Sequence, residues 1–138
     1  MRYAIFPEKM LLVERMSGPV SYQDVVVLTK EVWGDGLYDK SYDGIIDIRQ
    51  ASIDMGHSGL ESFVQLLLAS ESASEGRVAV ISSKPVETAL SYLLANKLTK
   101  GGSVSVFSTW GGVAAYLGLS ESVLAEIADE RAYDAMFD

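Results

Sequence analysis

Residues 44–48 have the sequence Gly44-Ile45-Ile46-Asp47-Ile48, the near-continuous apolar run of a strand that is buried on both faces of a sheet. A polar loop rich in glycine and tyrosine precedes it at residues 35–43. After it, Ser58 and Glu61 have the spacing of a capping box, and apolar residues follow at helical spacing: Phe63, Val64, Leu67 and Leu68. This segment predicts a strand, a loop and a helix that Ser58 caps.

The same strand–helix unit recurs toward the C-terminus. Residues 77–81 predict a strand, and a helix with Pro85 in its first turn follows, closed by Gly101-Gly102. The predicted buried face of that helix comprises Val86, Ala89, Leu90, Leu93 and Leu94. Residues 104–107 predict a further strand, with Ser108-Thr109 capping a short helix. Three such units in series predict parallel strands with right-handed crossovers.

Outside these units, each end of the chain has an element of its own. Two short apolar segments, 3–6 and 11–16, flank Pro7-Glu8-Lys9 and predict an antiparallel hairpin, after which Gly18-Pro19 breaks the chain. Ser21 and Asp24 have capping spacing ahead of a helix predicted from about residue 22 to residue 33. Beyond Gly118, Ser120 caps a last helix with one apolar-lined face: Leu124, Ile127, Ala128, Arg131 and Ala135. No repeat or linker divides the sequence, so residues 1–138 predict a single α/β domain with a mixed sheet flanked by helices.

Composition excludes several classes of function. The chain has 138 residues, 49% of them hydrophobic, which is enough for a core without metals or cross-links. It has no cysteine, which excludes disulfide frameworks, thiolate zinc sites, iron–sulfur clusters and cysteine nucleophiles. Its net charge of −8 repels phosphate backbones, so we expect no nucleic-acid partner.

Apolar runs are short throughout the sequence. Pro7, Glu8 and Lys9 interrupt the N-terminal segment before it reaches the length of a signal peptide. No window approaches the roughly 20 apolar residues of a membrane span. We therefore expect a cytoplasmic protein with no membrane span.

One group of residues is a candidate for chemistry: Asp47, Arg49, Asp54, His57 and Ser58. They join the strand predicted at residues 44–48 to the next helix, and the carboxyl ends of parallel strands are where α/β folds usually place their sites. A Ser–His–Asp hydrolase is conceivable here, but His57 and Ser58 are sequence neighbours and no Gly-x-Ser-x-Gly elbow is present. Structural roles explain the residues: Ser58 as a helix cap, and Arg49 as an ion-pair partner of Asp47 or Asp54. We expect no enzymatic activity.

Cofactor and metal motifs are also missing from the sequence. His57 is the only histidine, and the pairs Gly101-Gly102 and Gly111-Gly112 form neither a dinucleotide fingerprint nor a P-loop. We therefore expect no cofactor and no metal. The aromatic residues Trp33, Trp110 and the tyrosines of loop 38–42 suit either an interface or packing at the edge of the core, and the sequence leaves both open.

The order and spacing of these elements resemble a known family. The segments Leu11-Leu12-Val13-Glu14-Arg15-Met16-Ser17-Gly18-Pro19-Val20-Ser21, Gly44-Ile45-Ile46-Asp47-Ile48-Arg49, Gly76-Arg77-Val78-Ala79-Val80-Ile81 and Val104-Ser105-Val106-Phe107-Ser108 resemble the SpoIIAA-like proteins of the STAS and Sec14-like superfamily. The resemblance covers nearly the whole chain and implies a SpoIIAA-like fold.

The resemblance also implies two kinds of function. Anti-sigma-factor antagonists of this family are phosphorylated on a serine that matches Ser58, where this chain has Gly56 and His57 in place of the family's Asp and first Ser. A phosphate there would add about −1.5 to −2 charges at a helix N-terminus and so change protein binding. The other branch holds lipids or apolar ligands in a cavity under the helices, for which a chain of 15.0 kDa leaves little room.

The sequence therefore favours a non-enzymatic protein-interaction or regulatory module of the STAS type, with a partner contact around residues 49–60. A small-ligand or lipid carrier of the same fold is the alternative, and a hydrolase that uses Ser58 and His57 ranks below both. A homodimer is expected because the aromatic loop and the last helix offer apolar surface.

Overall fold

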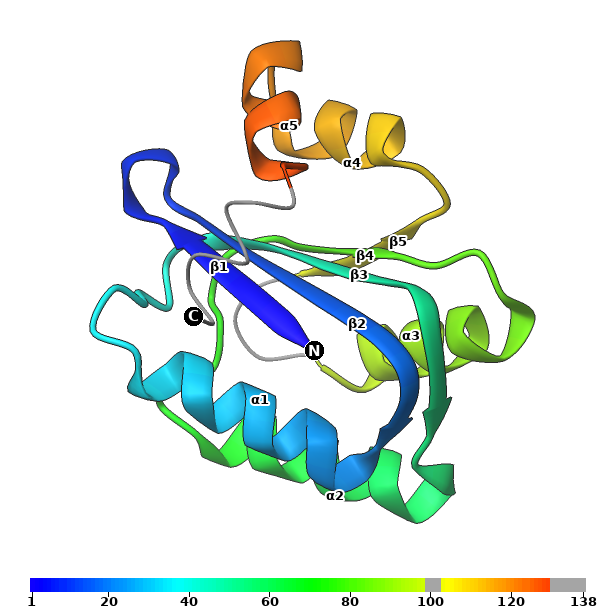
Figure 1. Ribbon diagram of the computed structural model, residues 1–138. Coiled ribbons are helices and arrows are strands. Elements are labelled where there is room, and N and C mark those ends of the chain that lie inside the picture. The colour runs from blue at the N-terminus through cyan, green and yellow to red at the C-terminus, as the bar shows by residue number, and fades with distance from the viewer. Residues whose placement is uncertain (99–102, 130–138) are drawn as a thin grey trace.

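The computed structural model describes residues 1–98 and 103–129, and within them five strands form one mixed sheet in the order β1-β2-β3-β4-β5 (Figure 1). Strands β1 (Arg2–Phe6) and β2 (Leu11–Ser21) form an antiparallel hairpin around a 3-10 turn at Pro7–Lys9. From β2 onward every neighbouring pair is parallel, through β3 (Asp43–Asp54), β4 (Val78–Ile81) and β5 (Val104–Phe107). The predicted α/β fold with an opening hairpin and parallel units is confirmed.

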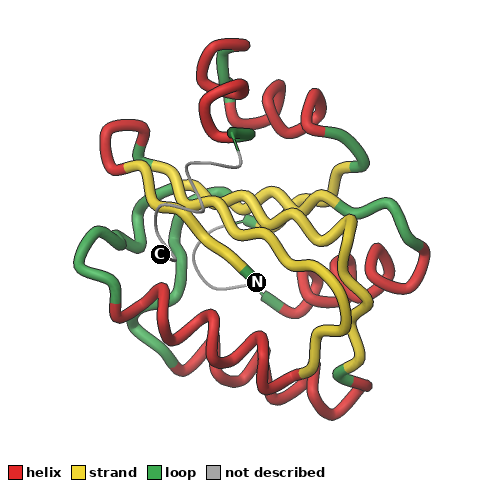
Figure 2. Tube along the Cα trace, in the orientation of Figure 1, coloured by secondary structure: helices red, strands yellow, loops and turns green. Residues whose placement is uncertain are grey.

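Helices cover both faces of the sheet (Figures 1 and 2). One face carries α1 (Tyr22–Gly34), α2 (Gly56–Ala69) and α3 (Pro85–Lys97), and the other carries α4 (Trp110–Leu117) and α5 (Glu121–Ile127). Successive side chains of a strand point to opposite faces, so β2 supplies Val13 to the core under α4 and α5 and Met16 to the core under α1. Among the described helices, none combines the length and apolarity needed to cross a bilayer.

Side chains at helix ends account for several boundaries. The predicted capping box is present, since Asp24 N donates to Ser21 Oγ and Ser21 N donates to Asp24 Oδ2. Thr109 and Ser120 cap α4 and α5 through backbone N–H groups, as predicted. Gly118 ends α4 in the left-handed region at φ 71°, where glycine avoids the penalty of a Cβ atom.

Two strands are longer than the sequence predicts. Strand β2 continues through Gly18-Pro19 to Ser21, where it pairs with Asp54 at the end of β3. The hairpin strand β1 pairs only with residues 11–15 of β2, so Pro19 lies on an edge where no ladder bond needs its missing N–H. Strand β3 extends to Asp54, whereas the sequence predicts that it ends at Ile48.

The predicted buried face of α3 is wrong in part: Leu90 and Leu94 are half-buried, but Val86, Ala89 and Leu93 are exposed. Val86 and Leu93 are 62% and 45% exposed, whereas Glu87 and Ser91 are buried. Ser91 satisfies its hydroxyl group by donating to Glu87 O at 2.8 Å, which allows this polar side of the helix to face inward beside Leu94. Glu87 and Ser91 have the same helical spacing as Val86 and Leu90, so hydrophobic periodicity alone does not predict that these polar residues face inward while Val86 and Leu93 are exposed. The predicted helix end at Gly101-Gly102 and the predicted face residues Arg131 and Ala135 lie outside the described residues.

Candidate functional site

The structure separates the predicted site residues into two groups. Asp47 and Arg49 lie in the middle of β3, Asp54 is its last residue, and His57 and Ser58 lie in the first turn of α2. At about 3.3 Å per strand residue, Asp47 and Asp54 are roughly 20 Å apart. The five residues therefore do not form one site.

The first group is an ion pair within one strand. Arg49 N and Nε donate to Asp47 Oδ1 at 3.1 and 3.0 Å, and Arg49 Nη2 donates to Asp47 Oδ2 at 2.8 Å. Asp47 is buried and the hydrogen bond to its carboxylate raises the pKa of Arg49. Of the two acids considered as partners of Arg49, the structure selects Asp47, and the pair neutralises a buried carboxylate.

The second group is exposed at the start of α2. The helix begins at Gly56 after Met55, no side chain caps it, and Gly56 adopts φ 62°, which lets β3 turn directly into the helix. The predicted Ser58–Glu61 capping box is wrong, because the Glu61 carboxylate accepts a hydrogen bond from Lys97 Nζ at 2.6 Å. His57 Nε2 lies 3.8 Å from Glu61 Oε1, and within the described residues no hydrogen bond joins His57 to Ser58.

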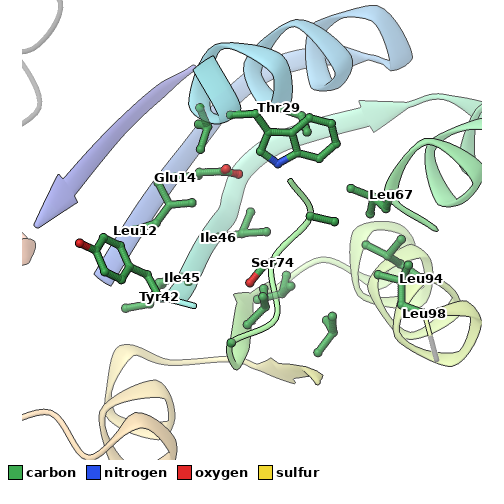
Figure 3. A pocket seen from close by; sticks show the side chains of 18 of the residues that line it. Leu12, Glu14, Thr29, Tyr42, Ile45, Ile46, Leu67, Ser74, Leu94 and Leu98 are labelled. Atoms are coloured by element: carbon green, nitrogen blue, oxygen red, sulfur yellow. The ribbon is translucent and has the colours of Figure 1, made fainter. Parts of the chain in front are cut away.

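A cavity of about 150 Å³ lies between the sheet and helices α1 to α3 (Figure 3). Its walls are mostly apolar and come from four strands, three helices and two loop segments, one between α1 and β3 and one between α2 and β4. The small residues Gly44, Ala73 and Gly76 line it, so these positions add little side-chain volume. The expectation that so short a chain leaves little room for a cavity is therefore wrong.

Glu14 is the acidic residue of this cavity. It projects from β2 on the same face as Leu12 and Met16, toward α1, and Figure 3 shows its carboxyl group directed into the cavity. Glu14 as a whole is half-buried and lines the cavity, and protein surrounds its carboxyl group. No described residue donates a hydrogen bond to this group or pairs with its charge. Burial raises the pKa of Glu14 from 4.5 to about 7.

Other polar groups of the cavity wall differ in how well they are satisfied. Thr29 Oγ1 donates to Val25 O at 2.8 Å, and Tyr38 Oη donates to Ser72 O at 2.7 Å. Burial, followed by the nearby charge of Glu14, raises the pKa of Tyr38 to about 12, so Tyr38 stays neutral. The hydroxyl group of Ser74 is buried and has no partner among the described residues. Glu14 and Ser74 therefore keep unused capacity for hydrogen bonds at the cavity.

A second cavity of about 90 Å³ adjoins the first. The two share six lining residues: Glu14, Thr29, Ile46, Phe63, Val80 and Leu94. The second cavity reaches Met55 and Leu60, directly behind the exposed turn that carries Ser58. The apolar space therefore runs along the sheet from the segment around Ser74 to the start of α2.

The aromatic residues pack within the chain. Trp33, Tyr38 and Tyr42 line the first cavity, and Trp110 packs on the opposite core, with the Arg15 guanidinium 5.6 Å from its ring centre. Sequence reasoning did not identify Glu14 as a site residue. The signal in the sequence was an acid that directly follows the apolar run Leu11 to Val13 and alternates with Leu12 along the strand.

Comparisons with known proteins bear on the fold. No family model matches the sequence, and no curated protein matches it. Among solved structures, the chain is similar to an uncharacterized protein from Shewanella loihica PV-4, of the DUF3478 family with a SpoIIAA-like fold, at 18% identity and a TM-score of 0.52. The match covers 78% of this chain and 83% of that one. This chain has a SpoIIAA-like fold. The resemblance stated from the sequence is confirmed for the SpoIIAA-like fold. At 18% identity the similarity concerns the fold alone.

Proposed function

We propose that this SpoIIAA-like chain is a non-enzymatic protein that binds a small ligand in the cavity under α1 to α3. The observation that carries the proposal is an apolar cavity of about 150 Å³ into which an unpaired carboxyl group points. Concave, mostly apolar sites with few polar groups are typical of small-ligand binding. The sequence alone favoured a protein-interaction module over a carrier, and the cavity reverses that order.

The placement of His57 supports a binding role over a hydrolytic one. His57 is 80% exposed, faces Glu61 and is not among the residues that line either cavity. Ser58 is exposed as well, so the two residues have no enclosed space beside them in which a substrate could be held.

A cytoplasmic location stays a prediction.

Native mass spectrometry of the chain purified from its own cells tests the proposal. The variant Val78→Phe places a ring in the cavity wall, and Val27→Phe makes the same change at an exposed position of α1. We expect a non-covalent small-molecule adduct on the wild type and on Val27→Phe, and none on Val78→Phe. A wild-type chain without an adduct, or an adduct that Val78→Phe retains, contradicts the proposal.

A regulatory protein contact at the start of α2 is the second candidate. Ser58 is exposed in the uncapped first turn, where the helix dipole favours an added phosphate. Met55 and Leu60 line the second cavity behind this turn, so a ligand there would touch the element that carries Ser58. A partner contact at Ser58 and a ligand in the second cavity would then lie on opposite sides of one turn.

Capture of partners from a lysate of the same cells tests the second candidate. Ser58→Asp adds a charge in the first turn of α2, and Ser62→Asp adds the same charge one turn later at another exposed position. We expect a protein that the wild type and Ser62→Asp capture and Ser58→Asp does not. Equal capture by the wild type and both variants would show that the start of α2 is not part of the contact.

Homodimerisation stays a proposal, and the exposed face of α3 is a better candidate for the dimer interface than the aromatic loop or the last helix. Trp33, Tyr38 and Tyr42 line a cavity, while Ile127 of the last helix is buried. The exposed apolar side chains of α3 are Val86, Tyr92 and Leu93. Sedimentation of the wild type and Leu93→Glu tests a dimer through α3, which the variant should convert to monomer.

A further inference from the structure

The charges around the cavity are unbalanced. Among the residues that line the two cavities, the titratable side chains are Glu14, Tyr38 and Tyr42, and none is a lysine, arginine or histidine. A carboxylate in an apolar space is costly unless a positive charge or hydrogen-bond donors face it. Within the described residues the chain supplies neither to Glu14, so a ligand that brings both fits this position.

We propose that the cavity binds a small apolar amine, whose ammonium group pairs with the Glu14 carboxylate while its apolar body lies among the cavity walls. This inference rests on the proposed function and adds the chemical class of the ligand. The carboxyl group titrates near neutral pH, so an arriving cation ionises it with little resistance. Aromatic rings on the walls, from Trp33 and Phe63 among others, suit both a cation and an apolar body.

Volume limits the size of the amine. An apolar cavity of about 150 Å³ holds a molecule of the size of benzene. The first cavity has this volume, and the adjoining cavity of about 90 Å³ extends it on the side of α2. A single ring with a short arm therefore fits, and phenethylamine is a suitable probe.

Charge on the ligand decides between the possible classes. An anion of the same shape would face the Glu14 carboxylate and be repelled. A neutral hydrocarbon would fill the cavity but leave the carboxyl group without a partner and further from water. An ammonium group gives the carboxylate a charge-assisted hydrogen bond, which is about twice as strong as a neutral one.

Calorimetric titration of the full chain with three matched probes tests the inference. Phenethylamine, propylbenzene and 3-phenylpropionate share a ring and a two-carbon arm and differ in the charge of the last group. We expect phenethylamine to bind the wild type roughly tenfold or more tightly than propylbenzene, and 3-phenylpropionate to bind most weakly. Glu14→Gln should abolish the preference for the amine, whereas Glu31→Gln at an exposed position of α1 should keep it.

The titration of Glu14 itself gives a second readout. In carbon-13 NMR of the carboxyl groups, with the Glu14 signal assigned from its loss in Glu14→Gln, phenethylamine should lower the pKa of Glu14 and propylbenzene should raise it. Tyr38, whose pKa burial raises to about 12, stays neutral throughout this range and does not interfere.

The outcomes separate the inference from the proposed function. If propylbenzene binds as tightly as phenethylamine, or if Glu14→Gln keeps the amine preference, the amine is the wrong class and the ligand-binding function stands. If none of the three probes binds the wild type, both the inference and the proposed function fail.

Discussion

The guanidinium group of Arg49 and the carboxylate of Asp47 are joined by two parallel hydrogen bonds, Nε to Oδ1 at 3.0 Å and Nη2 to Oδ2 at 2.8 Å. Both residues lie in β3, and Asp47 is 7% exposed. A fork of this kind is a strong, charge-assisted interaction that neutralises the acid where it lies. The pair is therefore expected to stabilise the fold.

Removal of the Arg49 side chain should destabilise the fold, because Asp47 is buried. We expect Arg49→Ala to lower the free energy of unfolding by about 2 kcal/mol, because Asp47 then stays buried without its main partner. Lys40→Ala, which breaks the exposed pair with Glu75, should cost less than about 1 kcal/mol. Urea denaturation of the two variants measures both values. Equal losses would show that the Asp47–Arg49 pair adds no more than a surface pair.

Ser58 should be tolerant of truncation. Its side chain makes no hydrogen bond that caps α2, whereas Ser21 Oγ accepts one from Asp24 N. We expect Ser58→Ala to change stability by less than about 0.5 kcal/mol, and Ser21→Ala to cost about 1 kcal/mol. Thermal unfolding of both variants checks this contrast. If Ser58→Ala lost as much stability as Ser21→Ala, Ser58 would act as the helix cap that the sequence predicts.

Glu14 should make stability depend on pH. Its pKa is about 7 in the folded chain against 4.5 ordinarily, so between these values the folded state holds the proton that the unfolded state has lost. The contribution of Glu14 to the free energy of unfolding is largest at acidic pH and falls as pH rises through 7. Relative to Glu14→Gln, the wild type should lose about 2 kcal/mol between about pH 5 and pH 8.

Urea denaturation of the wild type and Glu14→Gln at both pH values measures this change, since other titrating groups cancel in the difference. Glu31→Gln, the same change at an exposed position of α1, is the matched control. A Glu14→Gln difference that stays constant from pH 5 to pH 8 would mean that the carboxyl group is not buried as described.

Gly76 should not accept a side chain. A Cβ atom there would lie 2.7 Å from the carbonyl carbon of Tyr42 and closer still to its oxygen, and both are backbone atoms that cannot rotate away. We expect Gly76→Ala to cost about 1 to 3 kcal/mol by forcing these segments apart at the cavity wall. Gly36→Ala, whose Cβ meets nothing within 4 Å, is the control, and both are measured by thermal unfolding. Equal stability of the two variants would show that the approach of Gly76 to Tyr42 is not tight.

Local signals predict much of this fold. The Ser21–Asp24 box, the caps at Thr109 and Ser120 and the stop at Gly118 all depend on neighbouring residues, and the structure has each of them. The start of α2 depends on a distant residue. Lys97 of α3 donates a hydrogen bond to Glu61, for which the sequence predicts a local capping box with Ser58.

The cavity could not be predicted because it depends on how the helices lie on the sheet. The orientation of α3 buries Glu87 and Ser91 and exposes Val86 and Leu93, against the hydrophobic pattern. Leu94 then lines the cavity opposite Glu14, on a wall made of seven separate helices and strands and two loop segments. Sequence order gives no information about such a space, although Glu14, an acid that directly follows the apolar run Leu11 to Val13, marks where its polar group lies.

Methyl NMR of the full chain during titration with phenethylamine and with propylbenzene tests the central claim most directly, because the two faces of the sheet report separately. If the cavity is the ligand site, the methyl signals of Leu67, Leu94 and Leu98 shift on titration, whereas those of Val113 and Leu117 on the opposite face do not. Cavity methyl signals that stay unchanged with both probes, or shifts confined to Val113 and Leu117, would contradict the claim.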